Sequence, residues 1–270
     1  MEKLGLLAGI GNLPVEFMRA AQTTGHEVVV IAVVEGTAPE LEREANIYYK
    51  INVAKLDKII KTMKGEGVSK VTMIGKVTKE ILFRGLKFPD FRAIKLLAAL
   101  HNRKDDTIML AIVDELAKDG IEIVDQTAYL KPLLPPVGVL TKRRPTAEEA
   151  EDIRFGFAAA KAIGGLDIGQ TVVVKQKAVM AVEAIEGTDA CIRRGGELGR
   201  GRAVVVKVAK PNQDWRFDVP AVGRTTLQSM LESGCTVLAM EAGRTLFVEQ
   251  EAVLSLANEK GVCICAVDGT

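Results

Sequence analysis

Four charged side chains in residues 207–218 could act together on a phosphoryl group. Lys207 and Lys210 flank the end of an apolar, strand-like run, and Arg216 and Asp218 follow in a segment bracketed by prolines. The alternation of Arg216 and Asp218 with apolar residues predicts that both charges lie on one face of an extended segment. Cations stabilise negative charge that grows on phosphoryl oxygens, and a carboxylate can bind a metal ion or orient water. The pattern indicates phosphoanhydride hydrolysis, with a structural salt bridge of Arg216 to a neighbouring acid as the alternative.

A second group of acids and arginines follows the strand-like run at 178–184. The acids are Glu183, Glu186 and Asp189, and the arginines Arg193 and Arg194 follow them. Carboxylates can hold a cation and guanidinium groups can bind phosphoryl oxygens, so these residues suit a metal-and-phosphate site. The alternative is a solvated turn whose surface ion pairs contribute little to stability. We expect the glycine-rich residues 195–202 to form a loop.

A bound metal would need carboxylate ligands, because the chain contains only two histidines. This donor chemistry favours Mg²⁺, with Mn²⁺ as the alternative. The metal ligands that we expect are Asp218, Glu186 and Asp189.

Gly9 and Gly11 lie where the first strand is expected to meet the first helix. Glycines there let a phosphate approach the helix N-terminus, whose free N–H groups favour anions. The complete dinucleotide fingerprint would have a third small residue where this chain has Pro14. A phosphate-binding turn and a plain tight turn therefore both remain open.

Composition and charge exclude several classes of protein. The net charge of +1 leaves no basic surplus to neutralise phosphates, which argues against a nucleic-acid binder. No apolar run approaches the ~20 residues that span a bilayer. The four cysteines lack the spacing of metal ligands, and Cys263 and Cys265 alternate within one strand-like run. We expect reduced, buried thiols in a cytoplasmic protein, with both of these side chains on one face of the strand.

Residues 79–95 combine basic side chains with three phenylalanines, among them Phe83 and Phe91. Such a stretch could meet a membrane surface or a lipid. Aromatic side chains of this kind more often belong to a core, so both interpretations stay open.

The order of the apolar runs predicts an α/β protein with two domains. Residues 1–130 alternate strand-like and helix-like runs, which indicates a Rossmann-like open parallel sheet with ligands at the carboxyl ends of its strands. Residues 131–145 are rich in proline and indicate a linker. Residues 146–270 predict a mixed α/β catalytic domain, and Thr146 with Glu149 forms a capping-box pattern that opens its first helix. The expected strands are 3–8, 27–34, 70–74, 121–124, 171–175, 178–184, 203–208, 236–240 and 262–267.

Several motifs together resemble the LpxI family of UDP-2,3-diacylglucosamine pyrophosphatases, which belongs to the lipid A pathway. The most specific are E-G-T-D within residues 182–194 and D-V-P-x-x-G within residues 210–223. Further matches lie in the N-terminal L-G-L-L-A-G-I-G-N-L-P-V-E, at 166–170 and at 241–246. The resemblance therefore runs along nearly the whole chain.

The resemblance implies a magnesium-dependent hydrolase that splits UDP-2,3-diacylglucosamine into UMP and 2,3-diacylglucosamine 1-phosphate (lipid X), with the substrate between the two domains. It makes Asp218 the essential carboxylate, and we expect Arg216 and Lys210 to act with it. The substrate contacts that we expect are Gly9, Gly11, Asn12, Gln170, Thr188, Arg193, Lys207 and, for the acyl chains, Phe83 and Phe91. The resemblance further implies a cytoplasmic enzyme that meets its substrate at the inner-membrane surface, and it leaves a homodimer open.

Two other classes of function remain open from the residues alone. Gly9 and Gly11, with Glu35 at the end of the second strand, would suit a Rossmann-type dinucleotide-dependent oxidoreductase. Pro14 and the lack of a histidine or tyrosine near a plausible hydride site argue against it. A non-catalytic nucleotide-sugar binder would use the charges at 207–218 to position phosphates without cleaving them.

Overall fold

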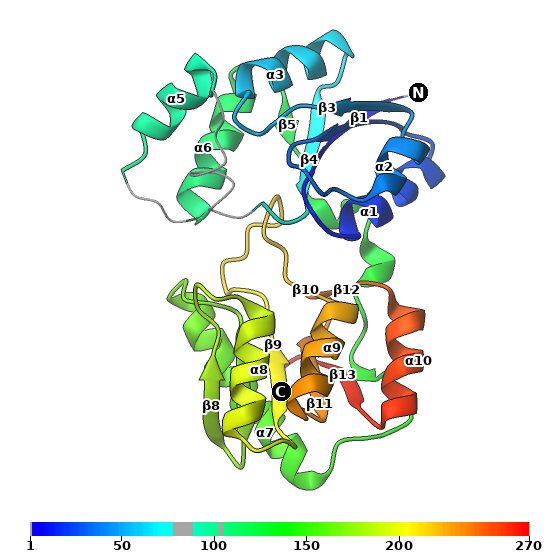
Figure 1. Cartoon of the computed structure of the whole chain (residues 1–270), viewed down its shortest axis with the longest axis vertical. Helices are drawn as coiled ribbons and strands as arrows, with labels where there is room; N and C mark the ends of the chain where they lie inside the picture. The colour runs from blue at the N-terminus through cyan, green and yellow to red at the C-terminus, as the bar shows by residue number, and fades with distance from the viewer. Residues whose placement is uncertain (1, 78–88, 102–104, 270) are drawn as a thin grey trace. The chain divides into compact units, whose positions relative to one another are not determined.

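The computed structural model of this chain describes residues 2–77, 89–101 and 105–269. The chain divides into two compact units, Met1–Leu130 with Trp215–Phe217, and Lys131–Asp214 with Asp218–Thr270. Each unit has its own main sheet with helices packed on it (Figure 1). The predicted α/β fold class, a parallel sheet followed by a mixed one, is confirmed.

The first unit contains a five-stranded parallel sheet. Its strands, in spatial order, are β3 (Ile47–Lys50), β2 (Glu27–Ala32), β1 (Lys3–Ala8), β4 (Lys70–Ile74) and β5 (Glu122–Ile123). β1 and β2 are buried and apolar after their first residues, as expected for central parallel strands covered on both faces. The strand order reverses between β1 and β4, which is the switch point where folds of this type place ligands.

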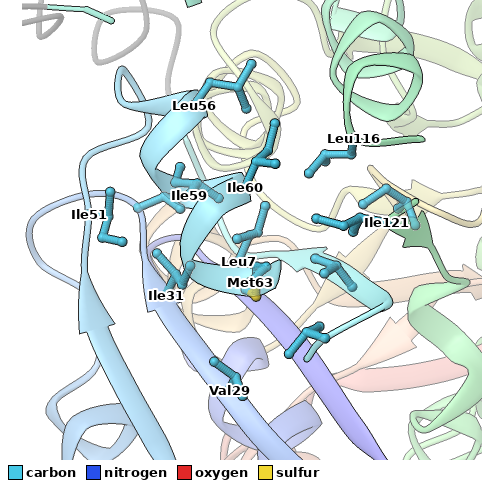
Figure 2. Close-up of a cluster of buried hydrophobic side chains, with 14 of the residues drawn as sticks. Leu7, Val29, Ile31, Ile51, Leu56, Ile59, Ile60, Met63, Leu116 and Ile121 are labelled. Atoms are coloured by element: carbon cyan, nitrogen blue, oxygen red, sulfur yellow. The ribbon is translucent and has the colours of Figure 1, made fainter. Parts of the chain in front are cut away.

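The helices of the first unit bury apolar residues against the sheet or against one another. The described ones are α1 (Leu13–Thr23), α2 (Pro39–Glu44), α3 (Leu56–Gly65), α5 (Phe91–Ala98) and α6 (Asp105–Ala117), with a 3₁₀ turn, η1 (Gln126–Ala128). In α3 the helical spacing of Leu56, Ile59, Ile60 and Met63 puts all four on one buried face. Figure 2 shows these side chains packed with strand residues such as Ile31.

Trp215–Phe217 belongs to the first unit although it lies far along the chain. Phe217 is 2% exposed and is part of the same core cluster as Ile60. The backbone carbonyl of Trp215 accepts a hydrogen bond of 2.9 Å from the backbone N–H of Gln126. Burial of a phenylalanine side chain contributes about 1.5–3 kcal/mol, so Phe217 anchors the tripeptide in this unit.

The second unit contains a mixed six-stranded sheet. Its strands, in spatial order, are β6 (Gly138–Val139), β13 (Cys263–Val267), β11 (Val237–Glu241), β9 (Val204–Lys207), β7 (Thr171–Lys175) and β8 (Ala178–Val182). β9, β11 and β13 run parallel, whereas β7 runs antiparallel to both of its neighbours and β6 to β13. β10 (Ala221–Val222) and β12 (Leu246–Phe247) form a separate parallel pair.

Helices cover both faces of this second sheet. They are α7 (Ala147–Gly165), α8 (Thr188–Leu198), α9 (Arg224–Ser233) and α10 (Gln250–Lys260), after a 3₁₀ turn, η2 (Lys131–Leu133). α8, α9 and α10 pack on one face and α7 on the other (Figure 1). Cys263 and Cys265 both lie in the cluster under α7, which confirms the prediction for these thiols. The capping box of Thr146 and Glu149 is present as predicted.

Gly195 and Gly196 lie inside α8, so the loop expected at 195–202 is wrong for its first residues. A Cβ on Gly195 would lie 2.4 Å from Val173 of β7, and one on Gly196 would lie 2.5 Å from Ser233 of α9. Because these two residues have no side chain, α8 packs closely on β7 and α9. The packing stabilises the helix by more than the low helix propensity of glycine costs. Among the described residues, no helix combines the length and apolarity needed to cross a bilayer.

Candidate functional site

The candidate site lies at one edge of the sheet of the second unit. The parallel strands β9 and β11 end there at Lys207 and Glu241, and the antiparallel strand β7 begins there at Thr171, which pairs with Lys207. The loops at this edge carry most of the second-unit residues that the sequence predicts. The carboxyl ends of parallel strands are the usual place for ligands in such sheets.

Lys210 lies between two carboxylates. Its Nζ is 2.7 Å from Oδ1 of Asp167 and 3.5 Å from Oδ2 of Asp218. The Lys210 side chain is 13% exposed, whereas that of Asp218 is 53% exposed. The site therefore presents a carboxylate to solvent with an ammonium group held beside it.

Two glutamine side chains contact Asp218. Nε2 of Gln170 donates to its Oδ2 at 3.4 Å, and Nε2 of Gln213 donates to its backbone carbonyl at 3.1 Å. Asp218 has a φ of 55°, in the left-handed region that aspartate tolerates better than most residues. Residues held in this region are frequent at ligand-binding sites.

The prediction that Arg216 and Asp218 share one face of an extended segment is wrong. The chain turns at Trp215 and Arg216, and Asp218 takes its left-handed conformation two residues later. The physical reason is Phe217, whose burial in the core of the first unit requires the chain to turn. Arg216 belongs to the first unit, where its Cζ lies 5.9 Å from the centre of the Phe217 ring.

A second, more buried cluster joins Lys207, Thr188 and Glu183. Lys207 is 9% exposed and donates from Nζ to Oγ1 of Thr188 at 2.8 Å. The Thr188 hydroxyl donates to Oε1 of Glu183 at 2.7 Å, and Oε2 of Glu183 accepts the backbone N–H of Gln170 at 3.2 Å. A Cβ on Gly169 would lie 2.2 Å from the carbonyl oxygen of Glu183, so only glycine allows this approach. The cluster is thereby joined to the loop that carries Gln170.

The acids expected to hold a metal do not form one group. Within the described ranges, no three histidine, cysteine, aspartate or glutamate side chains are grouped to hold an ion. Glu186 pairs with Nη2 of Arg194 at 2.5 Å. A hydrogen bond from its own backbone N–H, followed by the Arg194 contact, lowers the pKa of Glu186. Asp189 lies in the first turn of α8, where the helix dipole favours a negative charge.

The sequence predicts three further contacts, at Arg193, Phe91 and Phe83. Arg193 pairs through Nε with Glu232 of α9 at 2.9 Å. Phe91 is the first residue of α5 and is 81% exposed. Phe83 lies outside the described residues.

Gly9, Gly11 and Asn12 lie between β1 and α1 of the first unit. A Cβ on Gly9 would lie 2.7 Å from the backbone of Gly75, so the loops after β1 and β4 meet closely at the switch point. Gly11 has a φ of 117°, which requires glycine. Asn12 caps α1 without a side-chain hydrogen bond to the helix. The first glycine is explained by close packing, and the second by its backbone conformation.

Four residues at the site edge are not among the site residues that the sequence predicts: Asp167, Gln213, Lys161 and Glu241. Asp167, Gln213 and Glu241 lie inside the matched motifs at 166–170, 210–223 and 241–246. That position in a motif is the signal that could have found them. Lys161 is recognisable only from its contacts.

The fold and the site define a two-unit α/β protein with a Rossmann-like first unit and a lysine–carboxylate site in the second. The chain belongs to the LpxI family, because the family models of the LpxI N-terminal domain and the LpxI C-terminal domain match residues 3–133 and 136–265. UDP-2,3-diacylglucosamine pyrophosphatase LpxI of Caulobacter vibrioides is 36% identical over 279 residues, 99% of this chain and 98% of that protein. The predicted family is therefore confirmed.

Two other likenesses are more distant. The bifunctional purine biosynthesis protein PurH of Rhizobium meliloti is 29% identical over 139 residues, which are 47% of this chain and 23% of that protein. A structure of glycinamide-RNase-transformylase T from Mycobacterium tuberculosis matches with a TM-score of 0.29 and 12% identity, covering 51% of this chain and 38% of that one. Neither likeness adds to the functional argument.

Proposed function

We propose that this LpxI-family enzyme hydrolyses the pyrophosphate bond of UDP-2,3-diacylglucosamine to UMP and 2,3-diacylglucosamine 1-phosphate in lipid A synthesis. The observation that carries the proposal is the pairing of Lys210 with Asp218, at 3.5 Å, within the D-V-P-x-x-G motif region. That pairing occurs in a chain that matches a UDP-2,3-diacylglucosamine pyrophosphatase along 99% of its length.

The site residues can divide the work of this hydrolysis. Water adds to one phosphorus as the bond from that phosphorus to the bridging oxygen breaks, and negative charge grows on the phosphoryl oxygens. Lys210 and Lys207 supply cations near that charge, and Asp218 orients the water and accepts its proton. Gln170 holds the Asp218 carboxylate through a hydrogen bond of 3.4 Å. Arg216 would add a further cation.

Magnesium dependence is part of the proposal, with Mn²⁺ as the alternative. Mg²⁺ is usually bound through one or two carboxylates and completes its coordination with substrate phosphates and water. The half-exposed Asp218 fits an ion that arrives with the pyrophosphate, whereas the described residues offer no group of three acids for a resident ion. When bound, the ion would neutralise charge on the phosphoryl oxygens.

The lipid side of the substrate is a separate part of the proposal. Phe91, at 81% exposed, presents an apolar ring that acyl chains or a membrane surface could contact. Acyl contact by Phe83, transient contact with the inner membrane, a substrate lodged between the two domains and a homodimer all stay predictions.

The test is incubation of the purified protein with UDP-2,3-diacylglucosamine and Mg²⁺, followed by chromatography of the nucleotides. The expected result is UMP in amounts equal to lipid X, and loss of both products with excess chelator. Absence of UMP from folded, metal-supplied protein would contradict the proposal. Binding of the substrate without cleavage would support a nucleotide-sugar binder, and tight binding of NADH would support an oxidoreductase.

A further inference from the structure

An ion pair between a buried carboxylate and a lysine side chain that is 24% exposed holds the backbone directly before Lys210. Nζ of Lys161, on α7, lies 2.8 Å from each carboxylate oxygen of Glu241, the last residue of β11. The same Nζ donates to the carbonyl of Ala209 at 2.9 Å, and Oε2 of Glu241 accepts the Ala209 N–H at 2.8 Å. The pair therefore binds both backbone polar groups of one residue.

The burial of this pair is not explained by stability alone. Glu241 is 6% exposed and Ala209 is fully buried. Removing two charges from water costs free energy that their mutual attraction often does not recover, so a buried ion pair is weak grounds for stabilisation. The contacts of this pair instead converge on the point where the chain leaves β9 for the candidate site.

We propose that Lys161 and Glu241 are positioning residues for the phosphoryl site. By fixing Ala209 they set the direction in which Lys210 leaves the end of β9. They thereby set the distance of its Nζ from Asp167 and Asp218, which are 2.7 Å and 3.5 Å away. Neither residue needs to touch the substrate.

The expected size of the effect follows from the geometry of catalysis. A misplacement of about 1 Å in a catalytic group can cost about 100-fold in rate. Because Lys210 directly follows Ala209, a shift of that residue passes straight to the Lys210 backbone. The expected fall in kcat rests on the proposed function, whereas the fixing of the Ala209 backbone by Lys161 and Glu241 does not.

The test replaces the pair by apolar residues of similar length, Lys161→Met with Glu241→Met. Nε of Arg244 also lies 3.7 Å from Oε1 of Glu241, but the Arg244 side chain is 37% exposed. The exchange therefore leaves no fully buried charge without a partner, and we expect the fold to be kept. We expect kcat to fall about 100-fold with little change in KM. Hydrogen exchange in peptides covering residues 208–214 should become faster, because the Ala209 N–H loses its acceptor.

A matched control uses another ion pair of the same unit, Arg143 with Glu149, whose Nη2 and Oε1 atoms are 2.6 Å apart. Arg143→Met with Glu149→Met should lower thermal stability and leave kcat unchanged. Lys161→Arg keeps both the charge and the donors, so it should retain most of the wild-type kcat.

The inference is overturned if the Lys161→Met, Glu241→Met protein keeps wild-type kcat, or if kcat falls without faster exchange at 208–214. Should that protein fail to fold, Glu241→Gln is compared with Glu241→Leu. The glutamine can still accept the Ala209 N–H and should retain more kcat, whereas equal kcat in the two proteins contradicts positioning. If the wild type forms no UMP at all, the proposed function fails, and the exchange measurement alone decides the inference.

Discussion

At the scale of single residues, the ammonium of Lys210 is the group that joins the two exposed carboxylates of the site. Its Nζ contacts Asp167 and Asp218 while most of its side chain is buried. A cation held in this way can stabilise charge on a phosphoryl oxygen without moving at the moment of reaction.

Lys210→Met is expected to lower kcat by about 100-fold or more, because removal of one charge-stabilising group typically costs about 3–4 kcal/mol in the transition state. Steady-state kinetics of UMP release measures the effect. Lys177→Met, which removes an exposed lysine paired with Glu151, is the control and should keep wild-type kcat. Wild-type kcat in Lys210→Met would contradict the role given to Lys210.

Thr188→Val is expected to weaken substrate binding. The Thr188 hydroxyl accepts from Lys207 and donates to Glu183, so its loss leaves the buried Lys207 and the partly buried Glu183 without this partner. Such a loss lowers the free energy of unfolding by about 1–3 kcal/mol. Because Lys207 also loses the hydroxyl that orients its ammonium group, we expect KM to rise about tenfold, which is about 1.4 kcal/mol of binding free energy. Thr188→Ser, which keeps the hydroxyl, should behave almost like the wild type. Equal KM in the valine and serine variants would contradict a role of the Thr188 hydroxyl in substrate binding.

The charged and polar motif residues of the site can be predicted from the sequence. The contacts that hold these residues in place cannot. The sequence predicts Lys210, Asp218 and Gln170 as site residues, and the structure brings them together. Glu183 accepts the backbone N–H of Gln170, because the antiparallel pairing of β7 with β8 brings the two residues together. Asp167, which follows the end of α7, contacts Nζ of Lys210. These contacts depend on tertiary structure that no local pattern contains.

At the scale of elements, Gly195 and Gly196 are helical because α8 packs closely on β7 and α9. Long strands such as β2 could be predicted, because buried parallel strands are continuous apolar runs. The sequence does not predict α8, because Gly195 and Gly196 lower helix propensity and the contacts that favour glycine there are tertiary. The sequence does not predict the short strands β3, β10 and β12 either. Strands of two to four residues are too short to show a clear alternation of apolar and polar residues.

Gly195→Ala is expected to destabilise the protein by about 1–3 kcal/mol, the usual cost of overpacking. The new Cβ would lie 2.4 Å from Val173. Gly165→Ala, at the end of α7, is the control, since its Cβ would meet only Pro211 at an ordinary 3.7 Å. Urea unfolding of both variants measures the difference. An equal free energy of unfolding for the two would contradict the packing argument.

At the scale of the whole molecule, the path of the chain at 215–217 is the feature that the sequence did not predict. Phe217→Ala should lower the free energy of unfolding by about 3–5 kcal/mol, as for other buried phenylalanines. Phe155→Ala removes a ring that is 39% exposed and should cost much less. Thermal unfolding compares the two proteins. If both have the same midpoint, Phe217 is not the anchor.

The buried thiols give the molecule a dependence on alkaline pH. Burial, followed by the charge of Glu183, raises the pKa of Cys191 to about 12 from 9.0. A pKa raised by folding means that the native state holds the proton more tightly, so this contribution to stability is complete below about pH 9 and is lost as the pH rises towards 12. The free energy of unfolding should fall by up to about 1.4 kcal/mol per pH unit in that window through this group. Cys191→Ala should show a shallower slope than the wild type between pH 9 and 11, and identical slopes would contradict the assignment.

The claim that the second unit performs the hydrolysis through Asp218 is tested most directly by one comparison. UMP release from UDP-2,3-diacylglucosamine is measured for the wild type, for Asp218→Asn and for Glu151→Gln, which removes an exposed acid paired with Lys177. We predict that Asp218→Asn keeps the wild-type unfolding midpoint and loses at least about 100-fold in kcat, while Glu151→Gln keeps full activity. Near-normal UMP release by Asp218→Asn would contradict the claim.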